Sequence, residues 1–92
     1  MTERVVLAER LDTAGAVALA SELLQKPADG HVIIDATAVT HFGAQAVQVV
    51  LSAAKTLQTG GGTLECTGIS DRAASQLAAM GLSFAELPEV MQ

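Results

Sequence analysis

Apolar residues along the chain alternate between short continuous runs and longer stretches with helical spacing. Residues 5–8 and 32–34 are continuous apolar runs, and each predicts a strand. The second run is apolar on consecutive positions, which is typical of a central parallel strand buried on both faces. Residues 63–67 alternate and are rich in β-forming types, so they predict a third strand with one more solvated face, closed by a turn at Gly68.

Three helices are expected between and after these strands. The first begins near Asp12 or Thr13, whose side-chain oxygens can accept free N–H groups, and it stops at Pro27. The second ends at glycines 60–62 and carries apolar residues at helical spacing, namely Val47, Val50, Leu51, Ala54 and Leu57. The third begins near Ser70 or Asp71 and ends at Gly81, a residue that is free to adopt a positive φ.

The order of these elements predicts the fold class. Strands separated by helices imply right-handed parallel crossovers, hence an α/β fold in which helices pack against a small sheet. The pattern does not decide the secondary structure of the tail. Residues 83–90 could form a last short strand around residues 84–87 or a short terminal helix. We expect one domain over residues 1–92.

Charge and cysteine content exclude several classes of protein. The net charge is −5 and the five basic residues are scattered, so we expect no nucleic-acid binding. Cys66 is the only cysteine, which excludes an intramolecular disulfide and favours a reducing compartment. The charged amino terminus leaves no room for a signal-peptide core, and no apolar run approaches 20 residues. We therefore expect a cytoplasmic protein that does not insert into a membrane.

No arrangement of residues indicates catalysis or a cofactor. His31, His41 and Cys66 lack the spacing of a metal site. Ser52 and Ser70 have no evident base partner, so no nucleophile is predicted. Glycines 60–62 follow a helix and precede a strand, which is the reverse of a phosphate-binding loop. We expect no enzyme activity, no metal and no cofactor.

The stretch from His31 to Leu57 is the best candidate for a working surface. A buried strand ends at Asp35, a loop covers residues 36–42, and a helix starts at Gly43 or Ala44. Loops at the carboxyl ends of parallel strands form the exposed crevice in open α/β folds. His41 is a candidate contact residue because it lies in the loop directly before the helix.

Taken together, several segments resemble a STAS domain, the fold of bacterial anti-sigma factor antagonists. Residues 10–12 resemble the family's G-x-L-D segment, and residues 32–35 with Val39 resemble its central strand. Residues 60–64 match its G-G-x-L turn, and residues 80–82 match its late t-G-L. The resemblance implies a mixed or mostly parallel sheet with helices packed on one side. The first strand of the family's amino-terminal hairpin is missing or very short here.

The chain departs from the family at the start of the second helix. Antagonists carry D-S-S-G or D-S-T-G there, and a partner kinase phosphorylates the first Ser; residues 43–46 stand at these positions. Ala44 is thus a degenerate phosphoacceptor position, and Thr40, the nearest upstream hydroxyl, lies within the loop. The resemblance implies that a partner-binding surface remains, made of Asp12, His41, Phe42, Gly43, Ala44, Gln45 and Gln48.

The resemblance implies a non-enzymatic regulatory module that binds another protein. Residues 48–53 are similar to short STAS proteins of alphaproteobacterial chemotaxis gene clusters, which often lack the acceptor serine. We therefore expect a phosphorylation-independent adaptor that binds a signalling histidine kinase or response regulator. The alternatives are an antagonist of an anti-sigma kinase and a STAS subunit of a lipid-transport ABC ATPase. A homodimer through the exposed edge of the sheet also stays open.

Overall fold

A computed structural model describes residues 2–27 and 29–89 of the chain. The strands are β1 (Thr2–Val6), β2 (Arg10–Leu11), β3 (His31–Ala36), β4 (His41–Phe42) and β5 (Thr63–Ile69). The helices are α1 (Thr13–Leu24), α2 (Ala44–Thr59), α3 (Asp71–Ala79) and the 3-10 helix η1 (Phe84–Glu89).

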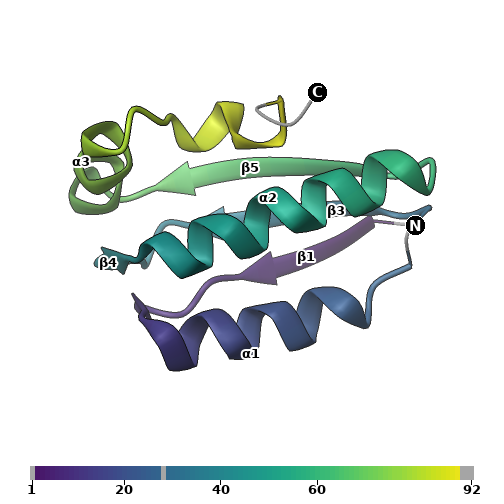
Figure 1. Cartoon of the computed structure of the whole chain (residues 1–92), viewed down its shortest axis with the longest axis horizontal. Helices are drawn as coiled ribbons and strands as arrows, with labels where there is room; N and C mark the ends of the chain where they lie inside the picture. The colour runs from purple at the N-terminus through teal and green to yellow at the C-terminus, as the bar shows by residue number, and fades with distance from the viewer. Residues whose placement is uncertain (1, 28, 90–92) are drawn as a thin grey trace.

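The main sheet has three parallel strands in the order β1-β3-β5. In this register Ile34 of β3 lies opposite Val5 on one side and Cys66 on the other. The short strands β2 and β4 pair separately, also in parallel. Helices α1 and α2 lie side by side over one face of the main sheet (Figure 1). The expected α/β fold, with a mostly parallel sheet and helices on one side, is confirmed.

Burial in β3 alternates along the strand, so the prediction of burial on both faces was wrong. Val32, Ile34 and Ala36 are fully buried, whereas His31, Ile33 and Asp35 are only half-buried. The reason is that the helices cover one face of the sheet alone, and the side chains of successive residues in a strand point to opposite faces. Ile33 therefore lies on the open face, although its sequence neighbours are core residues.

The first strand begins and ends earlier than the apolar run 5–8 predicted. It spans Thr2–Val6, with Val5 buried and Val6 65% exposed. Leu7 follows the strand, where it is buried and its backbone N–H donates to the Asp35 carbonyl oxygen at 2.9 Å. Polar residues fit in β1 because it is an edge strand of a sheet with one uncovered face.

Gly68 lies within β5 and does not end it, contrary to the predicted turn. Asp35 pairs with Thr67 and Ala36 with Ile69, so Gly68 is an extra residue in a β-bulge. Its φ is +67°, and a Cβ here would collide with the Thr37 hydroxyl. Only glycine combines this backbone conformation with so close a neighbour.

The tail forms the 3-10 helix η1, so its terminal-helix alternative was right and its strand alternative was wrong. Phe84 and Leu87 are buried, and the Phe84 ring packs edge-on against Phe42 with ring centroids 5.9 Å apart. Spacing of three residues places both side chains on one side of a tight helix. Val90, which the predicted segment also included, lies outside the described residues.

Candidate functional site

The start of α2 is positioned by the pairing of β2 with β4. Arg10 lies opposite His41 and Leu11 opposite Phe42, so two segments about thirty residues apart run side by side. The expectation that His41 lies in a loop was therefore wrong, because residues 41 and 42 continue into a short strand. The bend before β4 is also anchored, since the Thr40 backbone N–H donates to the Glu9 carbonyl oxygen at 2.7 Å.

Helix α3 fixes the same bend from the other side. Gln76 accepts a hydrogen bond from the Phe42 backbone N–H at 2.6 Å, and its amide nitrogen donates to the Thr40 carbonyl oxygen at 3.1 Å. The Ser70 hydroxyl donates to the Val39 carbonyl oxygen and also caps α3 by accepting from the Ala73 N–H. These bonds satisfy backbone groups that the two-residue strands leave open. The sequence analysis did not assign a role to Gln76.

A small hollow opens where α1 and α2 begin, and we call it the helix-start hollow. Its volume is about 220 Å³. The residues that line it come from β2, β4 and the first turns of both helices, and they are Leu11, Asp12, Thr13, His41, Gly43, Ala44 and Gln45. Five of the seven residues predicted as partner contacts line this one hollow, namely Asp12, His41, Gly43, Ala44 and Gln45.

The two helices that border the hollow begin differently. Asp12 caps α1, because its side chain accepts a hydrogen bond from the Gly15 N–H at 3.0 Å. Gly43 precedes α2 and makes no side-chain cap. A Cβ on Gly43 would lie 2.8 Å from the Leu11 carbonyl oxygen, so a capping side chain fits there only if the backbone moves. The first turn of α2 therefore offers N–H groups that no side chain caps.

Phe42 and Gln48 lie outside the hollow. The prediction of Phe42 as a partner contact conflicts with its burial, since it is only 1% exposed and packs against Phe84. Pairing of β4 with β2 directs this ring into the core. Gln48 is exposed as predicted, yet it lines the larger depression between α1 and α2. Gln45 and Gln48 thus border different depressions although they are one helical turn apart.

The matching family model is described as Mlab, STAS domain, and it covers residues 2–88. The chain belongs to the STAS domain family. Neither the search of curated proteins nor the search of solved structures gave a match. STAS domains typically bind protein partners in regulation and are generally non-enzymatic binding modules. In the part of this STAS domain that the structure describes, no helix is long and apolar enough to cross a membrane.

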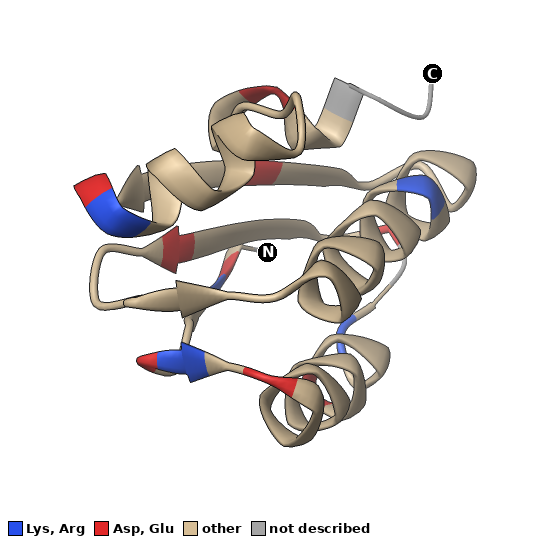
Figure 2. Cartoon of the chain, turned by 60° about the vertical axis from the view of Figure 1, so that its left-hand side comes forward, with Lys and Arg blue, Asp and Glu red and all other residues tan. Residues whose placement is uncertain are grey.

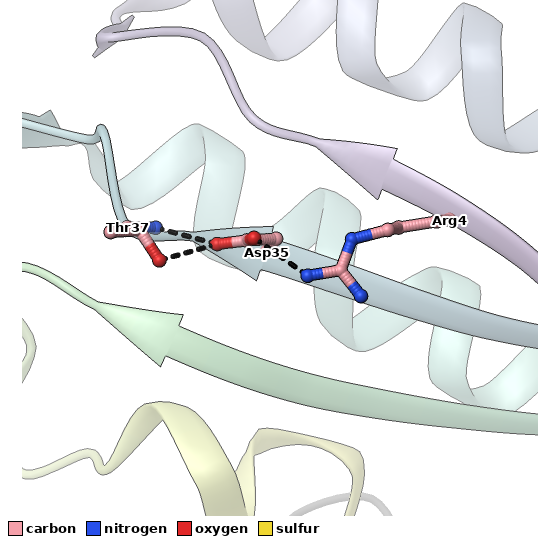
Figure 3. Close-up of polar contacts among 3 residues, drawn as sticks. All are labelled: Arg4, Asp35 and Thr37. Atoms are coloured by element: carbon pink, nitrogen blue, oxygen red, sulfur yellow. Dashed lines mark hydrogen bonds and ion pairs between the residues drawn. The ribbon is translucent and has the colours of Figure 1, made fainter.

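Asp35 organises the loop that leads from β3 to the hollow of this STAS domain. Its carboxylate accepts from the Thr37 N–H at 2.9 Å and from the Thr37 hydroxyl at 2.6 Å (Figure 3). Its second oxygen forms an ion pair with Arg4 of β1 at 2.9 Å. The Thr37 hydrogen bonds, followed by that from Arg4, lower the pKa of Asp35 to about 2. The spacing Asp-x-Thr was the available sequence signal for this turn.

The other titratable groups that the structure describes are dispersed over the fold. His31 lies 3.4 Å from a Glu65 carboxylate oxygen on the open face of the sheet, far along β3 from the loop. Burial raises the pKa of the Cys66 thiol to about 12, so this cysteine is a poor nucleophile. Among residues 2–27 and 29–89, no group of three or more His, Cys, Asp or Glu could hold a metal ion. The lining of the helix-start hollow instead offers hydrogen-bonding groups and small residues.

Proposed function

We propose that this STAS domain is a phosphorylation-independent adaptor that docks on a signalling protein through the helix-start hollow. The proposed contact residues are Asp12, His41, Gly43, Ala44 and Gln45, with Gln48 at the periphery. The partner would be a histidine kinase or response regulator of a chemotaxis or two-component pathway in the cytoplasm. The observation that supports the proposal is the gathering of these residues, from separate parts of the chain, around one hollow.

The chemistry of the hollow fits a protein partner. Gly43 and Ala44 are small, so a partner backbone can approach closely. Gln45 is exposed and has an amide that both donates and accepts hydrogen bonds. Asp12 is the only acidic residue among those that line the hollow. We expect recognition by neutral hydrogen bonds and shape, with little dependence on salt.

Phosphorylation is not required in this proposal because the expected acceptor position lacks a hydroxyl. Ala44 is the first residue of α2 and is exposed at the hollow. The Thr40 hydroxyl donates to the Glu9 carbonyl oxygen at 3.2 Å and does not line the hollow. Thr13 supplies the one side-chain hydroxyl among the lining residues. Thr13→Ala should therefore bind the partner as wild type does.

A pull-down with the full chain tests the surface. The double variant Ala44→Glu plus Gln45→Arg should lose the partner that wild type retains, because both changes place charged side chains in the hollow. Both positions are exposed, and the favourable negative charge and the unfavourable positive charge in the first turn of α2 roughly offset each other, so the variant should fold. Ser75→Glu, an exposed position on α3, is the matched control and should retain the partner. Equal recovery with the double variant would show that the surface is wrongly assigned.

Two other functions use the same surface and are separated by their partners. A classical antagonist would gain the mass of a phosphoryl group after incubation with anti-sigma kinases and ATP. A STAS subunit of a lipid-transport ABC ATPase would co-purify with that ATPase and gain no phosphate. The adaptor proposal also expects no gain of phosphate, but it expects co-purification with a histidine kinase or response regulator and not with the ATPase.

A further inference from the structure

A second, larger depression lies between α1 and α2, and we call it the interhelix groove. Its volume is about 450 Å³. Aliphatic side chains of both helices form its walls, and buried Val32 of β3 lies beneath them. The lining includes Ala20, Leu23, Leu24, Lys26, Val49 and Ser52. No other described element covers this face of the helices (Figure 1).

The surface around the interhelix groove carries few charges and is apolar on its α1 side, whereas on α2 it exposes the neutral polar residues Gln48, Ser52 and Thr56. Val17 is 66% exposed and Leu24 is 83% exposed. The two residues are seven positions apart, which is about two helical turns, so they lie on the same side of α1. No Asp or Glu lines the groove. Together α1 and α2 carry only Glu22 and Lys55 as charged residues, and Figure 2 shows how few charges these helices bear. Helix α1 is apolar on most of its sides, and such a helix is normally covered.

One pair of opposite charges near this surface, Lys26 and Asp12, could meet between two copies. Lys26 and Lys55 lie toward the carboxyl ends of the two helices, and Asp12 precedes the amino end of α1. Figure 1 shows that α1 and α2 run in the same direction. Consider a two-fold axis that lies in this face and runs perpendicular to the helices. It would pack each helix antiparallel to the same helix of the second copy, so that the carboxyl end of one lies over the amino end of the other. Lys26 would then approach Asp12 of the second copy, and the helix dipoles would be antiparallel.

We propose that two copies of this chain pack face to face through α1 and α2. Leu24 and Val17 of each copy would enter the interhelix groove of the other, with the axis near Ala20 and Ser52. The face is about 24 Å long and about 20 Å wide, from the length of α2 and the width of two helices. Standard interfaces bury about 800 Å² on each partner, so this face, at roughly 480 Å² on each copy, falls in the range of weak, transient interfaces. We therefore expect weak association, with a dissociation constant of about micromolar or above.

Sedimentation velocity of the full chain over a micromolar concentration series tests the dimer without any partner protein. Wild type should shift from monomer to dimer, and Leu24→Glu should weaken the dimer at least tenfold. Because Leu24 is 83% exposed, the variant should retain its circular dichroism spectrum and melting temperature. A chain that stays monomeric throughout the series would overturn the proposal and leave the groove to another occupant.

A matched control separates this interface from a dimer through the sheet. Val6 is an apolar residue on edge strand β1 and is 65% exposed. Val6→Glu introduces the same charge as Leu24→Glu and should leave the dimer unchanged. If Val6→Glu weakened the dimer as much as Leu24→Glu, the contact would lie at the sheet edge and the proposal would be wrong.

Cross-linking tests the position of the axis. Ser52 is exposed at the rim of the groove, and Ser75 is exposed on α3. A disulfide forms only between residues whose Cα atoms approach within about 7 Å, so a single cysteine cross-links two copies only near the axis. Oxidised Ser52→Cys should give a covalent dimer, and Ser75→Cys should not. Native Cys66 is buried and should stay reduced. Equal cross-linking of the two variants would contradict the arrangement.

Discussion

Gln76 of α3 holds the backbone of Phe42 in place. The amide oxygen of Gln76 accepts from the Phe42 N–H at 2.6 Å, and its amide nitrogen donates to the Thr40 carbonyl oxygen at 3.1 Å. One side chain thus spans both ends of the bend that leads into the helix-start hollow. Gln76 therefore connects α3 to the helix-start hollow, which β2, β4 and the starts of α1 and α2 form.

Gln76→Ala should destabilise the fold through this bend. Two partly buried backbone groups would lose their partners, which costs about 1–3 kcal/mol of unfolding free energy. Urea denaturation measures this change. Gln58→Ala is the control, because it removes a single exposed hydrogen bond to the Pro88 carbonyl oxygen and should cost about 0.5–1 kcal/mol. A loss at Gln76 no larger than that at Gln58 would contradict the role.

Asp35 should make stability depend on pH in the acid range. Its pKa is lowered to about 2 in the folded state, against an ordinary value of 3.8. A lowered pKa means that the carboxylate stabilises the fold above the ordinary value, and that this stabilisation is lost as pH falls through about 4 toward 2. Asp35→Asn should therefore lower stability at pH 6 and flatten the decline between pH 6 and pH 2. Urea midpoints across this range provide the measurement, and parallel curves for the two proteins would refute the assignment.

Gly68→Ala should be more destabilising than the same change at another glycine with positive φ. At Gly68 a methyl group meets the Thr37 hydroxyl as well as an unfavourable φ of +67°. At Gly61 the φ is +86° and a Cβ would meet nothing within 4 Å. We expect a loss of about 1 kcal/mol at Gly61 from backbone strain alone, and about 2–4 kcal/mol at Gly68. Thermal or urea unfolding of both variants compares them. Similar losses would mean that the bulge yields to accommodate the methyl group.

The Thr37→Ala background refines the comparison at Gly68. Removing the hydroxyl removes the nearest obstacle, so Gly68→Ala should cost less in that background than in wild type. The difference between the two costs measures the steric part of the effect. An unchanged cost would assign the whole loss to backbone strain.

The local parts of this fold could be read from the chain alone. Helix α1 begins after Asp12 and ends before Pro27, and α3 begins after Ser70, as their capping residues predicted. Three strands separated by helices pair in parallel, as their order required. Caps, helix stops and apolar periodicity act over a few residues, which is why sequence patterns reveal them.

Only the tertiary structure decided how the candidate site is built. The two-residue strands β2 and β4 are too short to show any periodicity, and they form because Arg10–Leu11 and His41–Phe42 meet across the fold. That pairing buries Phe42, which sequence reasoning placed on the surface, and it aligns the starts of α1 and α2 around one hollow. The lack of space for a side chain at Gly68 likewise comes from Thr37, thirty-one residues away in the chain. The sequence by itself determined which helices and main strands form, because their signals are local. Which side chains face solvent at the site was decided by contacts between distant segments, and such contacts leave no local pattern.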